Sequence, residues 1–266
     1  MPDYKGTTAL VTGAASGIGE ALARELAIRG ASVICADRNL AGAEATANAI
    51  GPSARAIECD LSNPEAAATL IEKCWATSGR LDLICSNAGI GHRGSPVQED
   101  MLNSDSLQAL WEVNFYAGLK IAQSYARLLE HNGSNGRLLV TASENSLSVP
   151  DAVKKGKMAF YAATKHALLV ALEWLRIEQQ DGPLELHVLL PGAVYTPLIA
   201  KALPDAALAP AELELISAER CAQVALQGID HGLFYIPTQA HLLEDMQPRM
   251  DEITQALAVL EIEKTF

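Results

Sequence analysis

Several features are missing from this 266-residue sequence, and each absence narrows its function. No stretch of about 18 apolar residues is present, so no membrane-spanning helix is expected. The first residues also lack the apolar core of a signal peptide. Positive charge is scarce, and the net charge of −12 disfavours nucleic acid and anionic membrane surfaces as partners.

Cysteine and histidine patterns typical of metal sites are missing too. The five cysteines are odd in number and include no C-x-x-C pair, so we expect buried free thiols rather than disulfides or zinc ligands. The six histidines show no ligand spacing, and no dedicated metal site is predicted. A reducing, cytoplasmic location fits this cysteine usage.

The sequence contains no Pro/Gly/Ser-rich linker and no low-complexity tract, which favours one domain over residues 1–266. Short apolar runs alternate with longer helical patterns, which predicts right-handed βαβ units in an α/β, doubly wound parallel sheet of about seven strands with helices on both faces. The expected strands are 8–12, 32–36, 55–59, 81–85, 137–141, 184–190 and 232–237. The expected helices are 18–29, 40–50, 64–77, 106–130, 160–179 and 241–263, the last within a C-terminal tail at 239–266.

A glycine-rich turn from Thr12 to Gly19 follows the first strand and opens the first helix. Its glycines allow a tight turn and a close approach of a pyrophosphate to the helix N-terminus, although the spacing is G-x-x-x-G-x-G rather than G-x-G-x-x-G. Asp37 ends the second strand, where an acid accepts hydrogen bonds from an adenosine ribose and repels a 2′-phosphate. The neighbouring Arg38 favours that phosphate, and a helix N-cap is the alternative role for Asp37. We expect NAD(H) rather than NADP(H).

Tyr161 and Lys165 are four residues apart at the start of a predicted helix, so their side chains share one face. A free tyrosine has a pKa of about 10 and is a poor base near neutrality. An ammonium about 4 Å away, at an effective dielectric of about 20, is worth roughly 4 kcal/mol, or a fall of up to about 3 in the pKa of the phenol. The pair is therefore a candidate proton carrier, although Y-x-x-x-K alone is common and equally describes a surface tyrosine beside a solvated lysine.

Four more motifs follow in a fixed order: Asp60-Leu61, Asn87-Ala88-Gly89, Asn114 in the long helix, and P-G-x-V-x-T from Pro191 to Thr196. Together with the glycine turn and Y-x-x-x-K, they resemble the short-chain dehydrogenase/reductase family, in its compact single-domain branch. The resemblance implies a Rossmann-type fold and assigns catalysis to Asn114, Ser143, Tyr161 and Lys165. It assigns cofactor binding to Gly13, Ser16, Gly17, Ile18, Gly19, Asp37, Arg38, Asp60, Leu61, Asn87, Gly89, Tyr161, Lys165, Pro191, Val194 and Thr196.

The catalytic serine is ambiguous in the sequence. The family's usual spacing from the tyrosine selects Ser148, whereas Ser143 lies at the carboxyl end of the fifth predicted strand. Ligands of open α/β sheets bind at those strand ends, so we choose Ser143 and infer an insertion at 151–157. Ser148 is the alternative.

The resemblance implies hydride transfer between a nicotinamide and a carbinol carbon. Tyr161 then exchanges the proton, Lys165 lowers the pKa of Tyr161 and bonds the nicotinamide ribose, and Ser143 orients the substrate oxygen. Asn114 holds a water that links Lys165 to solvent, and Val194 and Thr196 hold the carboxamide.

The segments 90–97, 144–158 and a lid helix at 196–216 are expected to select the substrate. They are mostly apolar, which favours an uncharged secondary alcohol or ketone; the lysines at 154–157 are either solvated or meet a carboxylate. The helices 106–130 and 160–179 are richer in apolar residues than one buried face needs, and the family pairs them in a homotetramer or homodimer. The alternative functions are an NADP(H)-dependent 3-oxoacyl-type ketoreductase and a non-catalytic NAD sensor.

Overall fold

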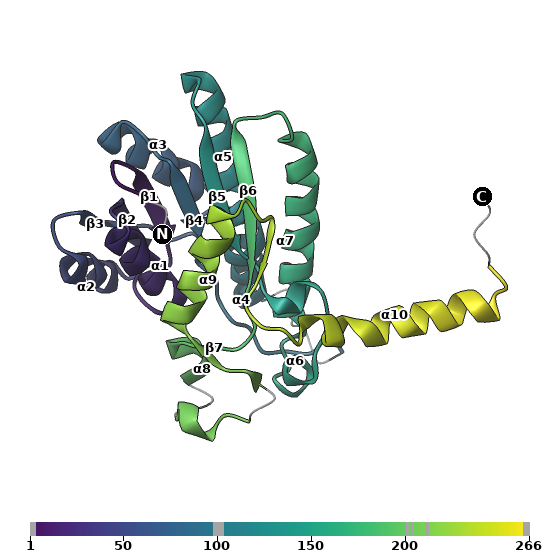
Figure 1. Cartoon of the computed structure of the whole chain (residues 1–266). Helices are drawn as coiled ribbons and strands as arrows, with labels where there is room; N and C mark the ends of the chain where they lie inside the picture. The colour runs from purple at the N-terminus through teal and green to yellow at the C-terminus, as the bar shows by residue number, and fades with distance from the viewer. Residues whose placement is uncertain (1–3, 98–103, 201–202, 204, 211–212, 263–266) are drawn as a thin grey trace.

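The computed structural model describes residues 4–97, 104–200, 203, 205–210 and 213–262 (Figure 1). Its centre is a seven-stranded parallel sheet in the order β3-β2-β1-β4-β5-β6-β9. The strands are β1 (Thr8–Thr12), β2 (Ser32–Asp37), β3 (Ala54–Glu58), β4 (Leu83–Ser86), β5 (Gly136–Thr141), β6 (Leu184–Leu190) and β9 (Tyr235–Pro237). A separate two-stranded pair joins β7 (Val194–Tyr195) to β8 (Ile216–Ser217). The predicted Rossmann-type sheet is confirmed.

Helices cover both faces of this sheet (Figure 1). One face carries α1 (Gly17–Ile28), α2 (Leu40–Ile50) and α9 (Ala218–Asp230), and the other carries α3 (Ala66–Ser78), α5 (Ala117–Asn132) and α7 (Ala159–Glu178). Successive strand residues point to opposite faces, so Leu10 joins the core under α3, α5 and α7 while Val11 joins the core under α1, α2 and α9. Because the strands are buried on both faces of the sheet, their sequences are continuous apolar runs rather than alternating apolar and polar residues.

All five cysteines are free thiols, as predicted. Cys74 belongs to the core on the α3 side, and Cys35, Cys85 and Cys221 belong to the core on the α1 side. Cys59 is only partly buried. Within the described residues, no helix combines the length and the hydropathy that crossing a membrane requires.

The long helix expected at 106–130 is not regular. It consists of α4 (Asp105–Trp111), a π-helical turn at Glu112–Tyr116 and α5. The π turn covers only five residues between two α-helices, which is too short to stand out from the helical periodicity on either side.

The lid helix predicted at 196–216 is wrong in its extent. The helix α8 covers only Pro197–Ala200, a 3₁₀ turn covers Ala206–Leu208, and β8 begins at Ile216. Parts of the segment, at 201–202, 204 and 211–212, lie outside the described residues. The segment 151–157, which the serine–tyrosine spacing predicts to be an insertion, contains a short helix, α6 (Asp151–Lys155).

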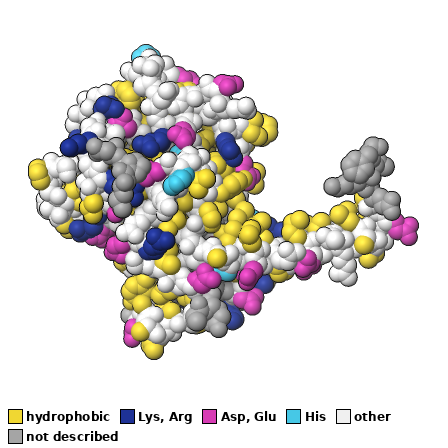
Figure 2. Space-filling model, viewed as in Figure 1, with side chains coloured by type: hydrophobic (Ala, Val, Ile, Leu, Met, Phe, Trp, Pro, Cys, Tyr) yellow, Lys and Arg dark blue, Asp and Glu magenta, His cyan; other side chains and the backbone are white. Residues whose placement is uncertain are grey.

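The final helix, α10 (Leu242–Val259), projects away from the body of the protein (Figure 1). Large apolar side chains at three- and four-residue spacing lie exposed along it and its C-terminal end. We call this set the α10 stripe: Leu243, Met250, Ile253, Leu257 and Leu260. The space-filling view shows apolar atoms along this arm (Figure 2). A helix whose apolar stripe faces water lacks a packing partner within its own fold.

Candidate active site

The sheet order places a crevice at the carboxyl ends of β1 and β4. The chain builds β1, β2 and β3 outward in one direction and then returns to add β4 on the other side of β1. Open α/β sheets bind ligands at such a reversal of strand order. Thr12, at the end of β1, fixes the crevice by accepting backbone N–H bonds from Asn87 and Ala88 on its Oγ1, at 3.0 and 3.1 Å.

The glycine turn lies at this crevice and has room for no other residue type at its key positions. Gly13 and Gly17 adopt φ values of +69° and +59°, which L-residues with side chains rarely take. A Cβ on Gly19 would lie 2.1 Å from the carbonyl oxygen of Gly13. A Cβ on Gly17 would lie 3.1 Å from Cγ2 of Thr196, so the turn packs against the P-G-x-V-x-T segment. This geometry fits a pyrophosphate at the N-terminus of α1.

A pocket of about 150 Å³ next to the turn gathers residues from four sequence motifs. Its lining includes six predicted cofactor residues: Gly13, Asp37, Arg38, Asp60, Leu61 and Gly89. The Asp37 carboxylate is fixed there, because Oδ2 accepts from Ala15 N–H at 3.0 Å and Oδ1 accepts from Asn39 N–H at 2.8 Å. Asn39, not Asp37, caps α2. The pocket therefore fits an adenosine whose ribose meets a carboxylate.

The remaining predicted cofactor residues lie along the same strand ends. Asn87 donates from Nδ2 to Thr12 O and accepts on Oδ1 from the Thr141 hydroxyl, at 3.2 Å each. Bonds from the Ser62 backbone and hydroxyl lower the pKa of the Asp60 carboxyl. Ser16, at the N-cap of α1, is exposed, Ile18 packs against the core on the α1 side, and Pro191 and Val194 are buried.

The structure brings Asn114 and Lys165 together behind Gly89. Lys165 is only 3% exposed and donates from Nζ to Thr141 O at 2.8 Å. Asn114, in the π turn, accepts from Ile90 N–H at 2.9 Å and donates to Ile90 O at 3.0 Å. A Cβ on Gly89 would lie 3.6 Å from Asn114 Oδ1 and 3.9 Å from Lys165 Nζ, which is ordinary van der Waals contact and places Gly89 next to both groups. The π turn thus aims the asparagine at this site, as π turns frequently do.

Ser143 lies beside Tyr161, whereas Ser148 makes no such contact in the described structure. The Ser143 hydroxyl hydrogen-bonds the Tyr161 phenol, lies 3.4 Å from Pro191 O and accepts from Asn145 N–H at 3.2 Å. It is 5% exposed and follows directly after β5 and Ala142. The strand-end argument therefore selected the serine that contacts the tyrosine.

The electrostatics of Tyr161 differ from the expectation. Burial raises the pKa of Tyr161, and this outweighs the opposing hydrogen bond from Ser143; the charge of Glu144 raises it further. Lys165 Nζ lies 5.9 Å from the centre of the Tyr161 ring. Burial lowers the pKa of Lys165 to about 8. The predicted fall in the Tyr161 pKa is thus wrong for the protein alone, because desolvation of the phenol was left out of the charge–charge argument.

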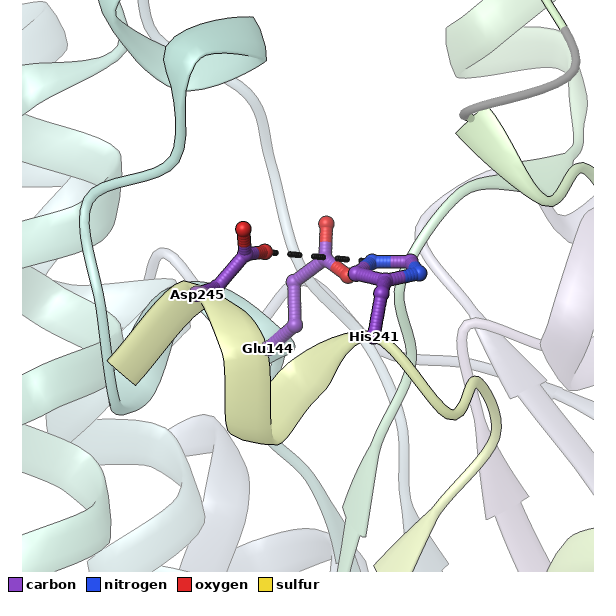
Figure 3. Close-up of side chains that lie close together, drawn as sticks. All are labelled: Glu144, His241 and Asp245. Atoms are coloured by element: carbon purple, nitrogen blue, oxygen red, sulfur yellow. Dashed lines mark hydrogen bonds and ion pairs between the residues drawn. The ribbon is translucent and has the colours of Figure 1, made fainter. Parts of the chain in front are cut away.

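Sequence reasoning missed an ion-pair cluster next to this site (Figure 3). His241, just before α10, places Nε2 3.0 Å from Glu144 Oε2 and Nδ1 3.1 Å from Glu214 Oε2. Asp245 Oδ2 lies 3.9 Å from Nε2. One carboxylate oxygen each of Glu144 and Asp245 and one ring nitrogen of His241 all lie within 4.8 Å of one another. The contact between Glu144 and His241 joins residues far apart in the chain, which no local spacing reveals.

Comparisons with known proteins identify the family of the chain. The model of the short chain dehydrogenase family matches residues 7–207. The chain is 33% identical over 259 residues to 1-deoxy-11-beta-hydroxypentalenate dehydrogenase of Streptomyces avermitilis, which covers 95% of this chain and 92% of that protein.

Two solved structures are similar in fold. A short-chain dehydrogenase/reductase from Burkholderia phymatum in complex with NAD gives a TM-score of 0.80 at 24% identity, over 96% of this chain and 97% of that one. The bulky-bulky ketone specific alcohol dehydrogenase from Comamonas testosteroni gives 0.73 at 25% identity, over 97% and 95%. With the family match over residues 7–207, the chain belongs to the short-chain dehydrogenase/reductase family.

Proposed function

We propose that this protein is an NAD(H)-dependent oxidoreductase that interconverts an uncharged secondary alcohol and its ketone. The observation that carries the proposal is the grouping of Ser143 with Tyr161, and of Asn114 with Lys165, beside a crevice built for a dinucleotide. A protein that only sensed NAD would have no need of a buried phenol bonded to a serine.

The roles follow from the contacts. When bound, NAD accepts a hydride at C4 of its nicotinamide, and NADH supplies one. Ser143 donates to the substrate oxygen and orients it, and Tyr161 takes or gives the proton at that oxygen. Lys165 holds a positive charge behind the tyrosine, and a water held by Asn114 would link it to solvent. A proton on the phenol suits ketone reduction, where Tyr161 acts as the acid.

The preference for NAD over NADP rests on Asp37. Its two backbone hydrogen bonds hold the carboxylate at the pocket that also contains Arg38. A 2′-phosphate there would meet a fixed negative charge, whereas a free ribose would find an acceptor.

The substrate class rests on the side chains near Tyr161. An apolar cluster of Leu107, Leu110 and Phe160, with Ile90, Trp111 and Tyr161 packed against it, lies beside the phenol. The Streptomyces relative, a hydroxypentalenate dehydrogenase by name, also acts on a hydroxyl group. We propose a cyclic, largely apolar alcohol or ketone, with the segment 196–216 acting as a lid over it.

The test is NADH formation from cyclohexanol, 1-indanol and 2-decalol, with NADP in parallel. Tyr161→Phe keeps the ring and removes the proton, so turnover is expected to fall at least about 100-fold with an unchanged melting temperature. Full activity of this variant would exclude Tyr161 as the acid/base.

We also propose that the protein works as a homotetramer, or at least a homodimer. A groove of about 980 Å³ runs between α5 and α7, and its lining includes Val170 and Trp174, which are 66% and 64% exposed. A stable interface takes roughly 800 Å² per partner, and we propose that a second copy covers both the groove and the α10 stripe. A cytoplasmic location remains a prediction.

A further inference from the structure

The segments after β5, after β6 and before β8 lie near the proposed catalytic residues. All three meet at the junction between β9 and α10. Gln239, in this junction, accepts on Oε1 from Gly192 N–H at 2.8 Å and donates from Nε2 to Ala193 O at 3.0 Å and to Glu214 O at 3.3 Å. A Cβ on Gly192 would lie 2.3 Å from Glu144 Oε2 and 2.7 Å from Gln239 Oε1. The segments after β5, after β6 and before β8 are therefore packed together without spare room.

His241 joins the segment after β5 to the segment before β8 through charge, and Figure 3 shows the ring beside Glu144. Its two ring nitrogens lie 3.0 Å from Glu144 and 3.1 Å from Glu214. The contact between Nε2 and Glu144 is a hydrogen bond, whereas the contact between Nδ1 and Glu214 is an ion-pair distance without hydrogen-bond geometry, so the ring holds Glu214 by charge and only when protonated. Burial lowers the pKa of His241, but the contacts with Glu214 and Glu144 outweigh burial and raise it overall.

The Glu144 carboxylate matters to the proposed site because of where it lies. It follows Ser143 directly, its side chain is only 14% exposed, and its charge acts on the Tyr161 phenol. Burial raises the pKa of Glu144, and the bond from His241 opposes this rise. Without a bonded cation, the loop that carries Ser143 would hold a poorly solvated charge and would move to relieve it.

We propose that His241 is a positioning residue of the hydride-transfer site: its imidazolium bridges Glu144 and Glu214 and thereby holds the Ser143 loop and the segment before β8 around the substrate. The inference rests on the proposed function. Among the described residues, the charged groups that face the ring are Glu144 from the loop after β5, Glu214 from the segment before β8, and Asp245 from α10.

The proposed bridge predicts the direction in which KM changes with pH. The folded protein holds the His241 proton more tightly than the unfolded chain, so the bridge is complete below pH about 6.5 and is lost as pH rises through the raised pKa of the ring. The KM for a ketone should therefore rise with pH over this window by a larger factor than kcat changes, because the bridge orders the loops around the substrate and His241 itself transfers no proton to it.

The experiment combines ring titration by NMR with NADH-dependent reduction of cyclohexanone, 1-indanone and 2-decalone between pH 5.5 and 9. Glu144→Gln and Glu214→Gln should each move the titration of the His241 ring to lower pH. His241→Gln should raise KM about tenfold at pH 6, with a smaller effect on kcat, and should remove the rise of KM with pH. His231→Gln, at an exposed histidine that bonds Gln227 O, is the matched control and should keep the wild-type KM profile.

Two results would overturn the inference: a ring titration that neither carboxylate variant moves, or a His241→Gln enzyme whose KM follows the wild-type pH course. If His241→Gln fails to fold, Glu214→Gln still tests the bridge. The Glu214 side chain is 43% exposed, so this substitution is expected to leave the fold intact. Wild-type protein that turns over none of the three ketones would instead defeat the proposed function, and the ring titration would still decide whether the bridge exists.

Discussion

Lys165→Met is expected to make the protein more stable while destroying its activity. Lys165 is 3% exposed, and burial lowers its pKa from 10.5 to about 8. This difference in pKa means that the charged, buried ammonium lowers the free energy of unfolding by about 3 kcal/mol at pH 7. Methionine has a similar shape and no charge, but it leaves Thr141 O without this donor, which costs about 1 kcal/mol.

The net expectation is a gain of about 2 kcal/mol in the free energy of unfolding, or a rise of roughly 4–8 °C in melting temperature. Denaturant titration at fixed protein concentration measures it. Lys154→Met, at a lysine whose side chain is 62% exposed, is the control and should leave stability unchanged. Hydride transfer with the alcohol panel should fall at least about 100-fold in Lys165→Met only.

The pH dependence gives a second check on the same reasoning. The unfolded chain keeps the Lys165 proton up to pH about 10.5, whereas the folded chain releases it near pH 8. Between these values the unfolded state binds more protons, so the stability contributed by this group rises with pH. The difference in stability between Lys165→Met and wild type should shrink from pH 7.5 to pH 9.5. A variant less stable than wild type, or a difference independent of pH, would refute the argument.

Three other changes test the crevice and the arm. Gly19→Ala should abolish NAD binding, measured by calorimetry, because its Cβ would come within 2.1 Å of a carbonyl oxygen of the glycine turn. Asp37→Ser removes a charge worth up to roughly 4 kcal/mol against a 2′-phosphate, so the ratio of kcat/KM for NADP to that for NAD should rise at least about tenfold; an unchanged ratio contradicts the role of Asp37. Ile253→Glu with Leu257→Glu should lower the sedimenting mass, because both side chains are about half exposed and need a partner to be covered, whereas Gln255→Glu should not.

The sheet and its helices were predictable because their signals are local. Short apolar runs, glycines after helices and an acid at Asp37 define strands, helix ends and the pocket next to the glycine turn within a few residues of each other. The π turn around Asn114 was not predicted, because it spans only Glu112–Tyr116 and is flanked by α-helix on both sides.

In the site, too, some features were predictable from local sequence and others depend on the assembled fold. The position of Ser143 followed from the end of a strand, but the pKa of Tyr161 depends on burial by side chains from distant parts of the chain. Likewise, His241 meets Glu144 and Glu214 only after the sheet is assembled. Electrostatics of this kind requires the fold, since desolvation has no signature in residue spacing.

The distribution of cysteines gives this protein built-in reporters of unfolding. Cys74, on α3, belongs to the core on one face of the sheet, and Cys35 on β2, Cys85 on β4 and Cys221 on α9 belong to the core on the other. Burial raises the pKa of Cys74 to about 11 and that of Cys85 to about 12, so native thiolate is scarce at neutral pH. Alkylation of each thiol therefore reads out how often its own layer opens, and mass spectrometry of the labelled peptides separates the two layers without adding any probe.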